Sequence, residues 1–176
     1  MIHKMTPLIH WLAKTLAILG GIVLFAMIIL TCVSIFGRSF IFLGLAPISG
    51  DFELVEAGAA FVVFAFLPWC QIKRGHAAVD IVTNFLPASI NRWIDLIAET
   101  LMCIAVIIIA WKLFDGTIAK SKYGETTFII QYPIWWAYAV SLSAALIGCV
   151  VAVYMVFLRF FELREGKSNS TSGAVH

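Results

Sequence analysis

The chain has 176 residues, of which 62% are apolar and only 12% are charged, and its formal net charge is +2. Ordinary soluble domains contain about 45–50% apolar and about 25% charged residues, so this composition excludes a soluble globular fold. Four runs almost free of charge approach the length of about 20 residues that crosses a bilayer as a helix. We therefore predict an all-α integral membrane protein with four transmembrane helices and no room for a separate soluble catalytic domain.

The four predicted spans belong to a single membrane domain of residues 1–165. They cover approximately residues 12–36, 52–70, 92–114 and 134–160. The first run is followed by the bulky Phe36 and by Arg38, so we expect a retained helix and not a removed signal peptide. Both termini are expected in the cytoplasm, because this orientation leaves eight of the twelve lysines and arginines on the cytoplasmic side. The polar residues 166–176 are expected to form a disordered cytoplasmic tail.

Three carboxylates open the second span. Asp51 follows Ser49 and Gly50 and is predicted to cap the helix, and Glu53 lies in the first turn, where the helix dipole favours an acid. Glu56 lies deeper, where a carboxylate usually faces a partner or water and not lipid. We take Glu56 as a candidate membrane-embedded acid, with an exposed surface group as the open alternative.

A polar stretch follows the second span, in the sequence LPWCQIKRGHAAVD of residues 67–80. Its tryptophan marks the headgroup level, its two cations hold this end in the cytoplasm, and its glycine permits a turn. A short amphipathic helix of about residues 78–87 is predicted to follow and to lie along the membrane interface. We interpret the stretch as a cytoplasmic structural corner and not as a reaction centre. The corner residues are Trp69, Lys73, Arg74, Gly75, His76 and Asp80.

The fourth span carries small residues in two adjoining rows. Small side chains at this spacing let another helix approach closely, which matters in lipid because apolar burial alone gives little drive for helix association. A weaker row of Ala13, Ala17 and Gly21 marks the first span. We predict a helix-packing face on the fourth span, and its partner is either another subunit of a complex or another helix of this bundle. Its residues are Ala137, Ser141, Ala144, Ala145, Gly148, Cys149 and Ala152.

The four cysteines suggest a quinone-linked thiol oxidase, an enzyme class of similar size. Such enzymes need thiols in the outer loops, where a thiolate can reach a partner's disulfide in water. In this sequence all four lie in or at the ends of apolar runs, and there is no C-x-x-C motif. We therefore expect small structural side chains and no catalytic residues. The cysteines are Cys32, Cys70, Cys103 and Cys149.

Metal, cofactor and nucleic-acid sites have no support in the pattern. His76 and Asp80 are four residues apart, but no second histidine lies near them, whereas a metal site needs several converging ligands. No phosphate loop or basic aromatic strip is present. The centres of all four spans lack charged residues, whereas an autonomous ion-coupled transporter places ionisable groups near the bilayer midplane. These observations favour an accessory subunit or scaffold over an independent transporter.

Three features together resemble a known family. They are the acidic start of the second span, the stretch KRGHAAVDIV of residues 73–82, and the YPIWWAY of residues 132–138 that opens the fourth span. Over about residues 10–160 the chain is similar to the small membrane subunit of tripartite ATP-independent periplasmic (TRAP) transporters, the DctQ-like or SiaQ-like family. Its most specific element is R-G-H-x-x-x-D, which here is Arg74, Gly75, His76 and Asp80.

The resemblance implies a non-enzymatic small permease subunit in the bacterial inner membrane. Its expected partners are a large transport subunit of about twelve spans and a periplasmic binding protein, and no cofactor is implied. The system would take up an organic acid of the C4-dicarboxylate or sialic acid class by sodium symport. Lys120, Lys122 and Glu125 are the candidate contacts for docking the binding protein. An independent four-span protein, such as a quinone-linked thiol oxidase or a small exporter, is the alternative.

Overall fold

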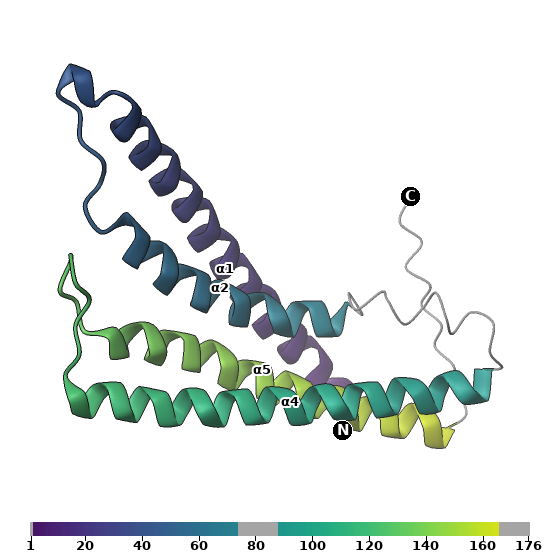
Figure 1. Ribbon diagram of the computed structural model, residues 1–176. Coiled ribbons are helices and arrows are strands. Elements are labelled where there is room, and N and C mark those ends of the chain that lie inside the picture. The colour runs from purple at the N-terminus through teal and green to yellow at the C-terminus, as the bar shows by residue number, and fades with distance from the viewer. Residues whose placement is uncertain (1, 74–87, 166–176) are drawn as a thin grey trace, which may run out of the picture.

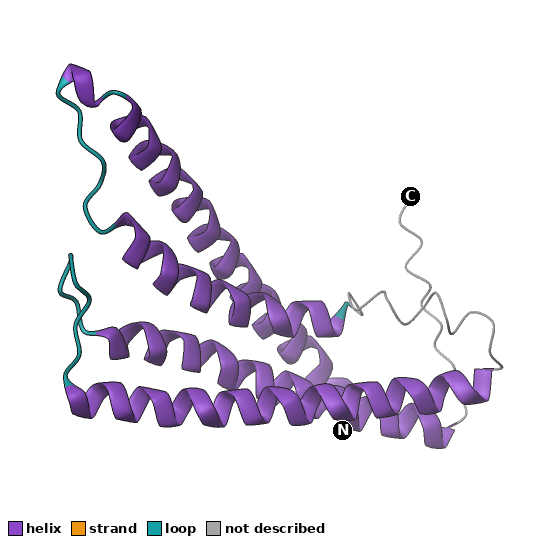
Figure 2. Cartoon of the chain, viewed as in Figure 1, coloured by secondary structure: helices purple, strands orange, loops and turns teal. Residues whose placement is uncertain are grey.

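The computed structural model describes residues 2–73 and 88–165 of the 176-residue chain. Within these ranges the chain forms helices joined by loops, with one isolated β-bridge and no strand (Figure 2). The elements are α1 (Ile2–Ser39), the 3-10 helix η1 (Ile41–Leu43), α2 (Asp51–Ile72), α4 (Ala88–Tyr123) and α5 (Ile134–Glu165). The predicted interfacial helix at 78–87 and the predicted tail at 166–176 lie outside the described residues.

Four of these helices are long and apolar enough to cross a membrane, which confirms the prediction of an all-α, four-span protein. The helices extend further than the apolar runs that predicted them. α4 has 36 residues, or roughly 54 Å at 1.5 Å per residue, against a hydrocarbon core of about 30 Å. Hydropathy marks only the part of a helix that lies in lipid, whereas backbone hydrogen bonding continues past it into water.

The four long helices form two pairs. α1 packs along α2, α4 packs along α5, and α2 packs on α5 to join the pairs. Figure 1 shows the pairs meeting at one end and diverging toward the end that carries the connections 40–50 and 124–133, which we call the loop end. In the most apolar window of each helix, 39% of α5 but only 11% of α1 is buried. α5 is therefore the central helix and α1 is peripheral.

Two apolar clusters join the helices. The first brings Ile9 and Ala13 of α1 against Val151 and Met155 of α5. The second, nearer the middle, joins α1, α2 and α5 through Leu16, Ala65 and Ala144. Each cluster contains alanine, at Ala13, Ala65 and Ala144, and these small side chains let the backbones come close, as is usual for helices packed in lipid.

Close approach of α1 to α2 depends on a glycine next to the predicted one. A Cβ placed on Gly20 would lie 2.8 Å from the Cβ of Ala65, whereas nothing lies within 4 Å of such an atom on Gly21. Ala13 of the predicted row is buried as expected. The row of small residues predicted the right region of α1 for a helix contact, but the glycine that faces α2 is Gly20 and not Gly21.

The start of α2 differs from the prediction at Asp51. The N-cap residue is Gly50, in the left-handed region at φ 81°, and Asp51 is the first helical residue. The Asp51 carboxylate accepts hydrogen bonds from its neighbour's amide, Phe52 N at 2.7 Å, and from the buried Ser34 hydroxyl of α1. Asp51 therefore joins α1 to α2 and does not cap α2, because Gly50 adopts the turn conformation that precedes the helix.

Candidate functional site

Glu53 is the best-connected polar side chain at the loop end. It is only 8% exposed, and its two carboxylate oxygens accept hydrogen bonds from consecutive backbone amides, Ile129 N at 2.8 Å and Ile130 N at 3.0 Å. The Tyr132 hydroxyl donates a hydrogen bond to the Glu53 backbone carbonyl oxygen at 3.4 Å. One residue in the first turn of α2 thus holds three positions of the α4–α5 connection.

The connection itself, residues 124–133, is a compact turn that we call the 124–133 loop. Its base is closed by Thr127 N donating to Tyr132 O at 3.0 Å and by Ile134 N donating to Glu125 O at 3.1 Å. Gln131 adopts φ 58°, a left-handed conformation that reverses the chain after the tip. The tip residue, Phe128, is 97% exposed. A fixed turn with a protruding aromatic ring results.

Partial burial at the loop end also changes the pKa of Tyr132, which follows the loop tip. Desolvation raises the pKa of the Tyr132 hydroxyl, and the negative charges of Glu53 and Glu56 raise it further. The hydroxyl therefore stays protonated and available as a hydrogen-bond donor at neutral pH.

In the first two turns of α2, the carboxylate that the chain itself covers is Glu53, whereas Glu56 is exposed. That Glu56 is embedded in the membrane stays a prediction. Sequence depth alone ranked Glu56 as the more deeply embedded residue, whereas the burial of Glu53 comes from the 124–133 loop, which folds over the outer face of the first turn.

The three candidate docking residues do not form one cluster. Lys120 and Glu125 form an ion pair across the end of α4, so they largely satisfy each other. Lys122 is exposed. Of the three, Lys122 is the residue whose charge is most available to another molecule.

The predicted packing face of α5 is covered within the chain. Ser141, Ala144, Ala145, Gly148 and Ala152 are buried, and Ala137 and Cys149 are partly buried. A Cβ on Gly148 would meet Pro68 of α2 at 3.6 Å and Val106 of α4 at 3.9 Å. The face does make close helix contacts, but with α2 and α4. Contact of this face with a partner subunit stays a prediction.

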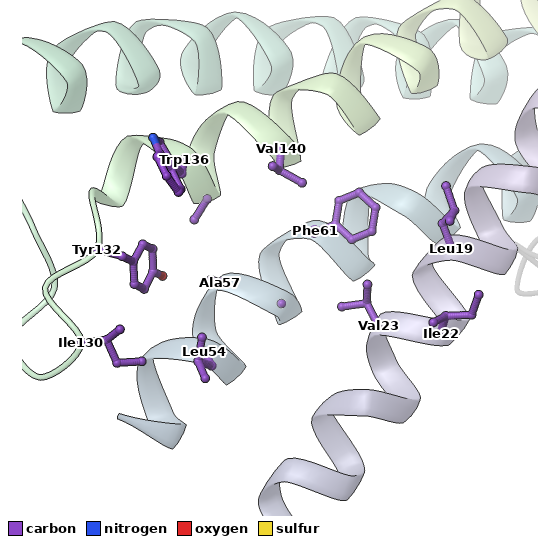
Figure 3. A pocket seen from close by; sticks show the side chains of 12 residues that line it. Leu19, Ile22, Val23, Leu54, Ala57, Phe61, Ile130, Tyr132, Trp136 and Val140 are labelled. Carbon is purple, nitrogen blue, oxygen red and sulfur yellow. The ribbon is translucent and has the colours of Figure 1, made fainter. Parts of the chain in front are cut away.

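An open apolar groove of about 640 Å³ lies between α2 and α5, and Leu19, Ile22 and Val23 of α1 lie at one end of it (Figure 3). Figure 3 shows the Trp136 and Val140 side chains on one wall and Leu54 and Ala57 on the other, with the Ile130 and Tyr132 side chains at its loop end. The loop held by Glu53 therefore also closes one end of this groove. Its lining residues are Leu19, Ile22, Val23, Leu54, Ala57, Gly58, Phe61, Ile130, Tyr132, Trp136, Ala137 and Val140.

At the opposite end of the bundle, polar side chains join α2 to α4. Gln71, which is 1% exposed, donates from Nε2 to Glu99 Oε2 at 2.9 Å. The ammonium of Lys73 lies 5.3 Å from the centre of the Trp69 ring, a cation–π geometry. Trp69 and Lys73 are the two residues of the predicted structural corner that the structure describes. Its remaining members, Arg74, Gly75, His76 and Asp80, lie outside the described residues.

The thiols are dispersed over the four long helices. All four are free, with Cys32 and Cys70 exposed, Cys103 buried and Cys149 partly buried. The Cys149 thiol donates to the Val106 carbonyl oxygen at 3.8 Å, which links α5 to α4. Among the residues that the structure describes, no group of three or more histidine, cysteine or acidic side chains could hold a metal ion.

One comparison with known proteins identifies the family. Residues 27–162 match the model of the family described as tripartite ATP-independent periplasmic transporters, DctQ component. Searches of curated proteins and of solved structures gave no match. The match covers well over half of the 176 residues and spans parts of all four long helices. The chain therefore belongs to the DctQ family, and is the small membrane component of a TRAP transporter.

Proposed function

We propose that this subunit scaffolds the large transport subunit in the bacterial inner membrane and helps the periplasmic binding protein to dock at the loop end. In this proposal the complete system carries an organic acid of the C4-dicarboxylate or sialic acid class into the cell by sodium symport. The subunit itself is non-catalytic. These finer properties rest on the resemblance to the family and on the distribution of charge described above.

The scaffold role is supported by the surface of α1. Its most apolar window has a mean hydropathy of 2.8 and is only 11% buried. Large side chains such as Ile22, Phe25 and Phe36 are more than half exposed. A surface of this kind belongs in lipid or against another membrane helix, because its exposure to water is unfavourable. We propose that part of it is covered by the large subunit.

The docking role is supported by the loop end. With both termini in the cytoplasm, as the lysine and arginine distribution favours, the loop end faces the periplasm. It presents the exposed Lys122 at the end of α4 and the protruding Phe128 ring on the 124–133 loop, which hydrogen bonds hold in place. A fixed loop loses little conformational entropy when a partner binds, which favours recognition.

The test of docking is charge reversal at Lys122. Lys122→Glu should raise the half-saturating concentration of binding protein in an uptake assay several-fold and leave the maximal rate unchanged, because a charge at the edge of an interface acts mainly on encounter. The effect should shrink as the ionic strength rises. Lys122→Gln, which removes the charge without reversing it, should give a smaller change.

Assembly must be measured on the same preparations. Co-purification of the variants with the large subunit should equal that of the parent protein, so that slower uptake is not a loss of complex. Phe128→Ala tests the apolar tip in the same assay. Unchanged half-saturation in both Lys122→Glu and Phe128→Ala would refute docking at this surface.

A further inference from the structure

We infer that Glu53 is a positioning residue that holds the 124–133 loop in the conformation that docks the binding protein. The inference rests on the proposed docking function and adds a residue to it. Glu53 does not need to touch the binding protein. It acts through the backbone of Ile129 and Ile130, to which both of its oxygens are bonded.

The geometry is that of a carboxylate clamp on a loop tip. Consecutive amides at 2.8 and 3.0 Å from the two oxygens fix the direction of the backbone directly after Phe128. Hydrogen bonds to a charged acceptor are about twice as strong as those between neutral groups. Because the clamped amides follow Phe128 directly, the clamp determines where the Phe128 ring points.

The clamp residue lies on α2, and α2 is bonded to α1 in the same helical turn. One turn of α2 carries both Glu53 and Asp51, and the Asp51 carboxylate is bonded to Ser34 of α1. Packing adds to the hydrogen bonds, because a Cβ on Gly50 would clash with the Ile130 side chain. The loop is therefore positioned relative to α1 and α2 as well as to the helices that it joins.

The loop's own hydrogen bonds do not replace the clamp. Thr127 N and Ile134 N close the base of the loop, below the tip. Without the carboxylate, the Ile129 and Ile130 amides would bond to water, because these residues are exposed, and water does not hold them in one direction. The tip should then sample several conformations, and fewer of them would present Phe128 correctly. The fraction of docking-competent protein limits the apparent affinity of the partner.

The chain offers matched variants for the test. Glu53→Gln keeps one acceptor oxygen and replaces the other with an amide that cannot accept, so one of the two bonds should remain. Glu53→Ala removes both. Glu56→Ala removes the exposed acid one turn away and serves as the control. All variants are prepared as the complete complex with the large subunit in membranes.

Two measurements are made on each variant. Amide hydrogen exchange at Ile129 and Ile130 reports the clamp, and uptake at varied concentrations of binding protein reports docking. We expect Glu53→Ala to speed exchange at both amides by about tenfold or more, since each bond to a charged acceptor is typically worth more than a tenfold change. We also expect a several-fold higher half-saturating concentration at an unchanged maximal rate. Glu53→Gln should fall between, and Glu56→Ala should match the parent.

The outcomes separate this inference from the proposed function. Unchanged exchange at Ile129 and Ile130 in Glu53→Ala would overturn the inference, whatever the uptake. Faster exchange with unchanged half-saturation would also overturn it if Phe128→Ala still weakens docking, because the tip would then dock without the clamp. If Glu53→Ala, Phe128→Ala and Lys122→Glu all leave half-saturation unchanged, the docking function itself fails. Because Glu53→Gln keeps part of the clamp, it decides the question if Glu53→Ala does not assemble.

Discussion

The contact between α1 and α2 at Gly20 should not tolerate a single added methyl group. The Cβ of Gly20→Ala would lie 2.8 Å from the Cβ of Ala65 and 3.5 Å from Cε1 of Phe66. Carbon atoms ordinarily pack about 3.5–4.0 Å apart, so the two helices would have to separate by about 0.7 Å or more at this point. Ala65 is a fully buried backbone-proximal group that cannot rotate away.

The magnitude follows from two opposing terms. Inserting a methylene-sized group into a packed core typically costs about 1–3 kcal/mol. Replacing glycine by alanine within a helix returns about 0.5–1 kcal/mol through lower backbone entropy. We therefore expect Gly20→Ala to lower the free energy of unfolding by roughly 0–2.5 kcal/mol, and by about 1–3 kcal/mol relative to Gly21→Ala, in which the entropy term is the same. Gly21→Ala carries only the second term, because nothing lies within 4 Å of the new Cβ, and should be neutral or slightly stabilising.

The assay is SDS titration of the purified protein in detergent, followed by tryptophan fluorescence. The two variants have the same composition and differ only in which neighbouring glycine is replaced, so each is the control for the other. Gly20→Ala should unfold at a lower SDS fraction than Gly21→Ala. Equal midpoints would refute the assignment of Gly20 to the α1–α2 contact.

Two further predictions concern the interior. Gln71→Leu should lower the free energy of unfolding by about 1.5–3 kcal/mol, because it removes the hydrogen-bond donor to Glu99. A double-mutant cycle with Glu99→Leu should show coupling between the two residues, and additive effects would contradict the hydrogen bond. Ala144→Leu should cost about 1–3 kcal/mol in the cluster with Leu16 and Ala65, whereas Val150→Leu on the exposed side of α5 should be neutral, and similar unfolding midpoints for both would show that the cluster can expand.

The face of α5 shows how far a sequence pattern can reach. Small residues every three or four positions predicted close helix contact, and the structure places Ala144 and Gly148 in such contacts. The pattern describes one surface only, so it could not say whether α2, α4 or another protein would lie against it. The choice of partner depends on the connections and crossing of the helices, which a single span does not encode.

The sequence by itself determined the four membrane spans and the family. Both depend on local properties, because a run of apolar side chains must match the bilayer thickness and a motif is read residue by residue. Only the tertiary structure decided that Glu53 and not Glu56 is the buried carboxylate. Its partners lie 76 and 77 residues away in the chain, and they reach Glu53 only after α4 and α5 have packed and carried their connection over the start of α2. Whether a polar side chain is buried depends on the segment that covers it, and the segment that covers Glu53 is the 124–133 loop, which is distant in the sequence.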